Sequence, residues 1–172
     1  MRRLTRLALF TAIALILSLV ESAFPPLLPV PGIRLGLANV VTLILLYAAG
    51  PRDAFIVLIL RIILASIFAG QGMSFFYSLA GGLLSFCVLC CLKRFLQGSF
   101  ILLASVFGAL SHNGGQLLTA VLITQTPALW AYAPILFVSG AVTGLFTGLC
   151  ALLCLRHLPG ISKSCGDSSG TF

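Results

Sequence analysis

Charged residues, and acidic ones above all, are scarce in this chain. Charged side chains make up 8% of its 172 residues, and the three carboxylates are those of Glu21, Asp53 and Asp167. Catalysis by paired carboxylates and binding of a hard divalent cation by several oxygen ligands both require more acidic groups than these. The sequence also has no G-x-x-x-x-G-K-[ST] loop for nucleotide phosphates, so any process driven by ATP would need separate ATPase subunits.

The chain is rich in apolar residues. They account for 60% of the chain, and the mean hydropathy is +1.18, which is typical of a membrane protein. A spanning helix needs about 20 largely apolar residues, and six segments come close to this length. These segments are Leu7–Phe24, Leu35–Ala49, Ala54–Ala69, Phe75–Leu92, Phe100–Thr124 and Pro134–Leu155. We therefore expect an all-α, polytopic membrane domain of six helices over residues 1–157, followed by a disordered cytoplasmic tail at 158–172.

The basic residues are distributed unevenly between the loops. With six spans both termini lie on one side of the membrane, and that side collects all but one of the lysines and arginines near segment ends. They are Arg2, Arg3, Arg6, Arg52, Lys93, Arg94, Arg156 and Lys163, with Arg34 on the opposite side. The positive-inside rule places both termini in the cytoplasm and the chain in the cytoplasmic (inner) membrane. This topology also explains the net charge of +7 better than nucleic-acid binding does.

Cysteine and histidine give little indication of chemistry. The six cysteines fall toward the predicted cytoplasmic side, where thiols stay reduced, so we expect them to pack between helices without disulfides or a metal. His112 lies in an apolar segment and His157 lies near the cytoplasmic surface, an arrangement unsuited to a Ser/His/Asp triad. The sequence indicates no cofactor.

Polar residues interrupt the fifth segment at SHNGGQ, residues 111–116. On a helix His112 and Gln116 share one face and Asn113 lies beside them. Gly114 and Gly115 weaken the helix and favour either close backbone approach or local unwinding. Irregular backbone at membrane depth survives where it lines a cavity or is buried in protein. The cluster therefore predicts the wall of a binding pocket.

A buried charge at a similar depth supports the same interpretation. Arg61 falls near the middle of the third segment, and a charge at the bilayer centre costs about 2.5–3.5 kcal/mol on insertion scales. It pairs either with Glu21, the carboxylate within reach, or with an anionic ligand. Toward the outer ends of their helices lie further candidate binding residues. These are Asn39, Gln71, Ser74 and Tyr77, with Arg34 in the outer loop and the prolines of residues 25–31 as a cover.

Three stretches carry a family resemblance. AFPPLLPVPGIRLGLANVVTL at 23–43, SLAGGLLS at 78–85 and GALSHNGGQL at 108–117 resemble the family labelled heptaprenyl diphosphate synthase component I. That family is grouped with the Gx transporters, which are substrate-binding S components of energy-coupling factor (ECF) transporters. The similarity covers residues 1 to about 157.

The resemblance implies six helices, an outward-facing substrate pocket, an ECF coupling transmembrane subunit and ATPase subunits. It also implies a small-residue stripe on the first helix that packs against the coupling subunit, which here is Ala8 and Ala12. A second stripe, Gly140, Gly144 and Gly148, is expected to serve internal packing.

These inferences predict a non-enzymatic substrate-binding subunit of an ECF-type transporter, which captures a small anionic or polar-headed molecule from the outer side. A synthase activity would need the clustered aspartates that the chain lacks. Two alternatives remain open. One is an accessory membrane subunit of isoprenoid synthesis, and the other is a membrane subunit of a redox complex.

Overall fold

The computed structural model describes residues 2–23, 36–70, 72–95 and 100–157, and all regular elements in these ranges are helical. The helices are α1 (Arg2–Ala23), α2 (Asn39–Ala48), α3 (Pro51–Ala69), α4 (Gly72–Phe95), α5 (Ile101–Thr124), the 3₁₀ helix η1 (Pro127–Tyr132) and α6 (Ala133–His157). The prediction of an all-α fold is confirmed for this part of the chain. The predicted tail at 158–172 lies outside the described residues.

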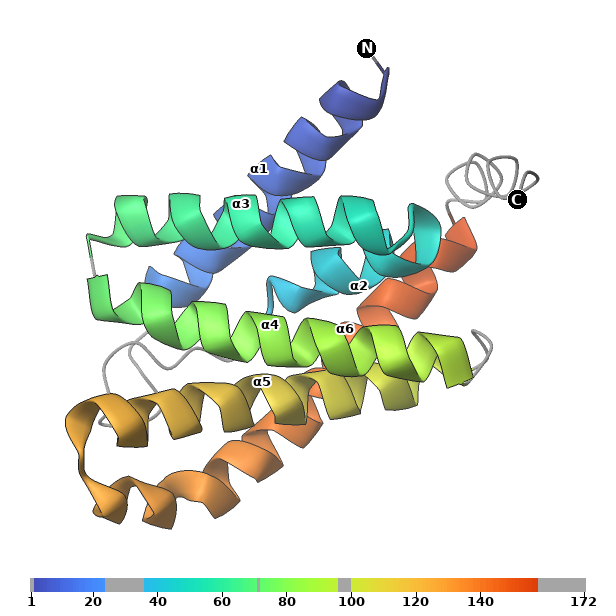
Figure 1. The fold of residues 1–172 in the computed structure, drawn as a ribbon. Coiled ribbons are helices and arrows are strands. Elements are labelled where there is room, and N and C mark those ends of the chain that lie inside the picture. The colour runs from blue at the N-terminus through green and yellow to red at the C-terminus, as the bar shows by residue number, and fades with distance from the viewer. Residues whose placement is uncertain (1, 24–35, 71, 96–99, 158–172) are drawn as a thin grey trace.

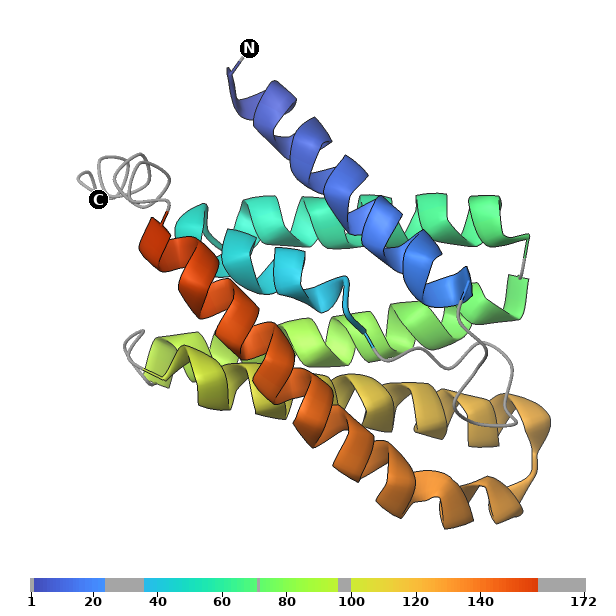
Figure 2. The same ribbon diagram turned by 180° about the vertical axis from the view of Figure 1, so that it is seen from behind.

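The helices form a bundle in which neighbours along the chain run in opposite directions. α3, α4 and α5 lie side by side (Figure 1), and α1 and α6 cross them on the opposite face (Figure 2). α1 begins and α6 ends toward the same end of the bundle, where α3 and α5 also begin and α4 ends. This end carries Arg3, Arg52, Lys93 and Arg156, so we name it the basic end.

Four stretches are long and apolar enough to cross a membrane. They are Arg3–Ser22, Gly72–Phe95, Ile101–Thr124 and Pro127–His157. Large apolar side chains on these helices point outward, for example Leu9 at 60% exposed, Phe146 at 58% and Val138 at 67%. Exposure of this kind along whole helices is characteristic of surfaces that face lipid. The chain is a membrane protein.

The other two helices differ from simple spans. α3 has 19 residues and carries Arg52, Asp53 and Arg61. α2 has ten residues, which at about 1.5 Å per residue gives a helix about 15 Å long, half the hydrocarbon thickness of about 30 Å. The count of six spans therefore stays a prediction.

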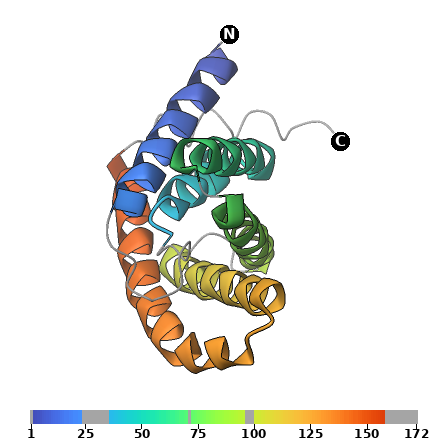
Figure 3. The ribbon, with the colours of Figure 1, turned by 90° about the vertical axis from the view of Figure 1, so that its left-hand side faces the viewer.

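The short helix α2 lies among other helices of the bundle. It contacts α1, α3, α4 and α6 and lies among them in the view along the bundle (Figure 3). Seven of its ten residues are buried, and Leu43, Leu45 and Leu46 are among the largest fully buried side chains. The sequence predicted a segment from Leu35, but the helix begins at Asn39, after Gly36 has turned the backbone into the left-handed region at φ +83°.

Glycines set the contacts among α4, α5 and α6. A Cβ on Gly115 of α5 would lie 2.9 Å from the Gly81 Cα atom of α4, and a Cβ on Gly144 of α6 would lie 2.7 Å from the Val106 Cα atom of α5. Helices without side chains at these points approach closely enough for extensive van der Waals contact. The expectation that the Gly140, Gly144 and Gly148 stripe packs internally is confirmed.

α5 continues without a break through SHNGGQ. The alternative of local unwinding at Gly114 and Gly115 is therefore wrong. The alternative of close approach between helix backbones is confirmed for Gly115. Gly114 has nothing within 4 Å of a built Cβ. Main-chain hydrogen bonding within α5, supported by packing on both sides, outweighs the low helix propensity of two glycines.

Candidate functional site

The buried guanidinium of Arg61 lies at the centre of the candidate site. Arg61 is halfway along α3 and 5% exposed. Its Nη2 donates a hydrogen bond to the Asn39 Oδ1 atom over 3.3 Å, and Asn39 is the first residue of α2. Burial of a permanent charge is costly unless polar groups surround it. Asn39, a candidate binding residue in the sequence, thus contacts Arg61 directly, and binding by either residue stays a prediction.

Gly36 and Glu21 add a second contact beside this arginine. The Gly36 backbone N–H donates to the Glu21 Oε1 atom over 2.5 Å, which joins the end of α1 to the chain just before α2. A Cβ at position 36 would lie 2.9 Å from Asn39 Nδ2 and 3.3 Å from His112 Cδ2. Both the positive φ and these close contacts require glycine here. The sequence did not single out Gly36, because it fell inside the apolar segment predicted to begin at Leu35.

His112 and Gln116 pair on the buried face of α5, as their spacing predicts. His112 Nε2 and Gln116 Nε2 are 3.0 Å apart and hydrogen-bonded, and both residues are buried. A Cβ at Gly81 of α4 would lie 3.1 Å from His112 Nδ1 and 2.8 Å from Gln116 Cγ. Gly81 therefore makes room for this pair between α4 and α5.

Arg61, Glu21, Gly36 and His112 line one cavity together. Ser18 of α1 and Ser78 of α4 also line it, so its polar groups come from α1, α3, α4, α5 and the chain just before α2. Its volume is about 20 Å³, which is room for about one water molecule, whereas sites for drug-sized ligands enclose about 300–1,000 Å³. A ligand larger than water would have to displace part of the lining.

A second small cavity shares Gly36 with the first and is also lined by Asn39. These two residues line it together with Ser105 and Thr147, whose hydroxyl oxygens are hydrogen-bonded at 2.8 Å between α5 and α6. Its volume is about 10 Å³, at the lower limit for one water molecule. Gly36 thus lines both a cavity with charged groups and a cavity with hydroxyl groups.

Other predicted site residues lie elsewhere. Asn113 donates from Nδ2 to the Leu136 carbonyl of α6 over 2.8 Å, so it faces a helix contact away from Arg61. Ser74 and Tyr77 are buried near the start of α4, and Tyr77 packs with Ala120. Ser74 lies one turn before Ser78, which does line the cavity. The structure therefore brings together some of the predicted residues, and their role in binding stays a prediction.

Several predictions fall outside the described residues. Arg34, Gln71 and the proline-rich cover at residues 25–32 belong to this group. On α1, Ala8 and Ala12 are exposed, as a docking stripe requires, and their contact with a coupling subunit stays a prediction.

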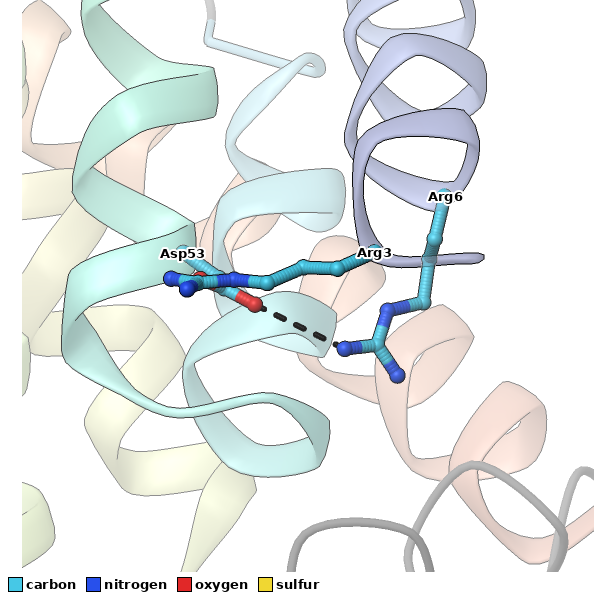
Figure 4. A network of polar contacts seen from close by, with 3 residues as sticks. All are labelled: Arg3, Arg6 and Asp53. Atoms are coloured by element: carbon cyan, nitrogen blue, oxygen red, sulfur yellow. Dashed lines mark hydrogen bonds and ion pairs between the residues drawn. The ribbon is translucent and has the colours of Figure 1, made fainter. Parts of the chain in front are cut away.

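A charge network ties α1 to α3 at the basic end. Arg3 donates to Asp53 Oδ1 from Nη2 at 2.5 Å and from Nε at 3.1 Å, and Arg6 Nη2 lies 3.6 Å from Asp53 Oδ2 (Figure 4). Asp53 stands in the first turn of α3, where the helix dipole also favours a carboxylate. Sequence analysis did not predict this network, which lies far from Arg61 along α3.

These features define a helical membrane protein whose interior holds a buried arginine among polar groups from several helices. The chain belongs to the heptaprenyl diphosphate synthase component I family, whose pattern matches residues 10–153. The matched range contains the Gly36, Arg61 and His112 positions, and the resemblance to this family is confirmed, whereas the similarity to ECF S components stays a prediction. No curated protein and no solved structure matches the chain.

Proposed function

We propose that this protein is the substrate-binding subunit of an ECF-type transporter and that it captures a small anionic or polar-headed molecule at the Arg61 cavity. The observation that carries the proposal is a buried guanidinium in a cavity lined by polar groups of several helices. An ionisable residue inside a membrane domain marks a solute pathway more often than a packing contact.

The orientation follows from the charge distribution. We place the basic end in the cytoplasm, because clusters of lysine and arginine mark the cytoplasmic side. The Glu21 end of α1 then lies toward the outer side, and the ligand enters there. In this arrangement α2 and α3 complete a six-helix membrane domain in the inner membrane.

In this proposal the coupling subunit docks on α1. Ala8 and Ala12 are exposed one helical turn apart, and small residues at this spacing allow close helix approach within a bilayer. A transmembrane coupling subunit docks on this stripe, and ATPase subunits supply the energy.

The carboxylates support a non-enzymatic role. Glu21 is engaged with Gly36 at one end of the bundle, and Asp53 is engaged with Arg3 and Arg6 at the other. Two carboxylates so far apart do not form the clustered Mg²⁺ and diphosphate site that prenyl transfer needs. The positions of these two described carboxylates therefore favour a role in binding without catalysis.

Mass spectrometry of small molecules that co-purify with the detergent-solubilised protein tests the binding function. A defined anionic or polar-headed compound should accompany the wild type and the Arg52→Ala control, and it should be missing from Arg61→Ala. Arg52 belongs to the same helix and is exposed at the basic end, so the control removes an equal charge away from the cavity. Equal recovery from all three proteins would reject the proposal.

The family name favours a second candidate, an accessory membrane subunit of heptaprenyl diphosphate synthesis. Here the chain would hold a catalytic partner or its isoprenoid diphosphate at the membrane. Prenyltransferase activity in membranes with and without this chain separates the two functions. Activity that depends on the chain, with no ligand recovered from the purified subunit, supports the accessory role.

A further inference from the structure

The chain places one of its own carboxylates at an anion position inside the candidate site. Glu21 Oε1 accepts the Gly36 N–H, and Glu21 lines the same cavity as Arg61. Gly36 holds its N–H there through a left-handed backbone at φ +83°. A backbone donor next to a guanidinium is a common recognition unit for carboxylates and phosphates.

Charge balance limits how an anionic ligand can enter. Among the described residues of the cavity, Arg61 is the permanent cation and Glu21 the carboxylate. A ligand anion added beside Glu21 would place a second negative charge next to its carboxylate in a partly buried setting, which desolvation and like-charge repulsion disfavour. An anion that replaces Glu21 keeps the original balance.

The volume of the cavity leads to the same conclusion. The cavity volume of about 20 Å³ admits about one water molecule, so a lining group must leave before a ligand enters. Arg61, Ser78 and His112 stand within helices packed on neighbours, whereas Glu21 is half-buried two residues before the end of α1, and the adjacent Ser22 is exposed. Glu21 is therefore the lining group that can leave with the smallest loss of helix packing.

We propose that Glu21 is a built-in competitor, which the carboxylate or phosphate group of the ligand displaces from the Gly36 N–H and from the cavity that it shares with Arg61. This inference rests on the proposed function and adds its ligand class and its consequence. Displacement breaks this contact between the end of α1 and the chain just before α2. Because α1 also carries Ala8 and Ala12, occupancy of the cavity is transmitted to the helix on which the coupling subunit docks.

Inorganic phosphate serves as the probe, with the full-length protein in nanodiscs of phosphatidylcholine and ionic strength held constant with sodium chloride. Thermal unfolding gives the phosphate midpoint for wild type, Glu21→Gln, Arg61→Gln and the control Ser22→Ala, which alters the same end of α1 without touching the carboxylate. Hydrogen exchange of peptides covering residues 15–23 reports release of α1. A parallel arm without phosphate uses nanodiscs that contain phosphatidylglycerol.

The midpoint for Glu21→Gln should fall about tenfold relative to wild type and Ser22→Ala, since a hydrogen bond to a charged group contributes an effect of this size. Arg61→Gln should not respond. Phosphate should raise exchange at residues 15–23 in wild type, and Glu21→Gln should exchange faster before phosphate is added. The same changes in the phosphatidylglycerol arm alone would identify a lipid headgroup as the anion and support the displacement equally.

Two results would overturn the inference, and they differ in whether the proposed function also fails. Equal midpoints for wild type and Glu21→Gln, with loss of response in Arg61→Gln, would leave the binding site intact and reject displacement of Glu21. An unchanged response in Arg61→Gln would remove the binding site itself, and the displacement with it. Absence of a response in Glu21→Gln to either anion source also rejects the inference.

Discussion

Arg61 Nη2 and Asn39 Oδ1 lie 3.3 Å apart, which joins the middle of α3 to the first residue of α2. The contact couples a buried charge to the start of the most enclosed helix in the bundle. Any molecule that engages Arg61 therefore acts directly on the position where α2 begins.

Replacement of this arginine should abolish binding without preventing membrane insertion. In Arg61→Ala, the Asn39 oxygen loses its donor and the cavity loses its cation, so affinity for an anionic ligand should fall by about 100-fold, as expected when a hydrogen-bonded charge is removed. Size-exclusion chromatography checks the fold, and ligand titration checks affinity. Arg52→Ala should bind as the wild type does, and an Arg61→Ala protein with wild-type affinity would contradict the cavity assignment.

Gly36→Ala should destabilise the protein more than the same change at Gly70. Both glycines have positive φ, +83° and +63°, but a Cβ at Gly70 meets nothing within 4 Å, whereas one at Gly36 meets Asn39 and His112. The left-handed backbone alone costs about 1–2 kcal/mol for alanine. Thermal unfolding in detergent should show that cost for Gly70→Ala and a larger loss for Gly36→Ala. Equal losses would mean that Gly36 makes no demanding side-chain contact.

Alanine substitutions at two adjacent glycines of α5 should change the unfolding temperature in opposite directions. Gly115→Ala places a methyl group 2.9 Å from the Gly81 Cα atom, while Gly114→Ala meets nothing within 4 Å. Alanine favours a helix over glycine by about 1 kcal/mol, so Gly114→Ala should raise the unfolding temperature and Gly115→Ala should lower it by separating α4 from α5. The His112–Gln116 pair faces the same contact, so ligand affinity should fall in Gly115→Ala only. Similar behaviour of the two variants would refute close α4–α5 packing.

Ala8→Trp should block assembly with a coupling subunit and leave ligand binding unchanged. A tryptophan on the small-residue stripe prevents close helix approach, whereas Leu9→Trp alters a neighbouring exposed position that points about 100° away around α1. Co-purification with the coupling and ATPase subunits measures assembly. Recovery of the complex with Ala8→Trp would remove α1 as the docking helix.

The sequence predicted the α5 part of the site well and the rest less completely. The i, i+4 spacing correctly placed His112 and Gln116 together, because a continuous helix fixes that relation. Asn113 was grouped with them, but one residue along a helix rotates the side chain by about 100°, which turned it toward Leu136 of α6. Gly36 was missed because a positive φ leaves no trace in hydropathy.

The helix bounds show the same division between local and tertiary effects. α5 was predicted almost to the residue, since polarity changes sharply at both of its ends. The length of α2 depends on where the backbone turns and on enclosure by four other helices, and neither is encoded in a window of apolar residues. The Arg3–Asp53 contact joins residues 50 positions apart and depends on how α1 packs on α3.

The enclosure of α2 has a consequence for how the protein responds to its bilayer. A thicker or thinner membrane changes the tilt of helices that face acyl chains, which here are the outer ones with exposed apolar side chains. α2 packs against other helices, so its length does not have to match the thickness of the bilayer. The Arg61–Asn39 contact at its start is thereby shielded from lipid composition, and its geometry can stay constant while the outer helices change their tilt.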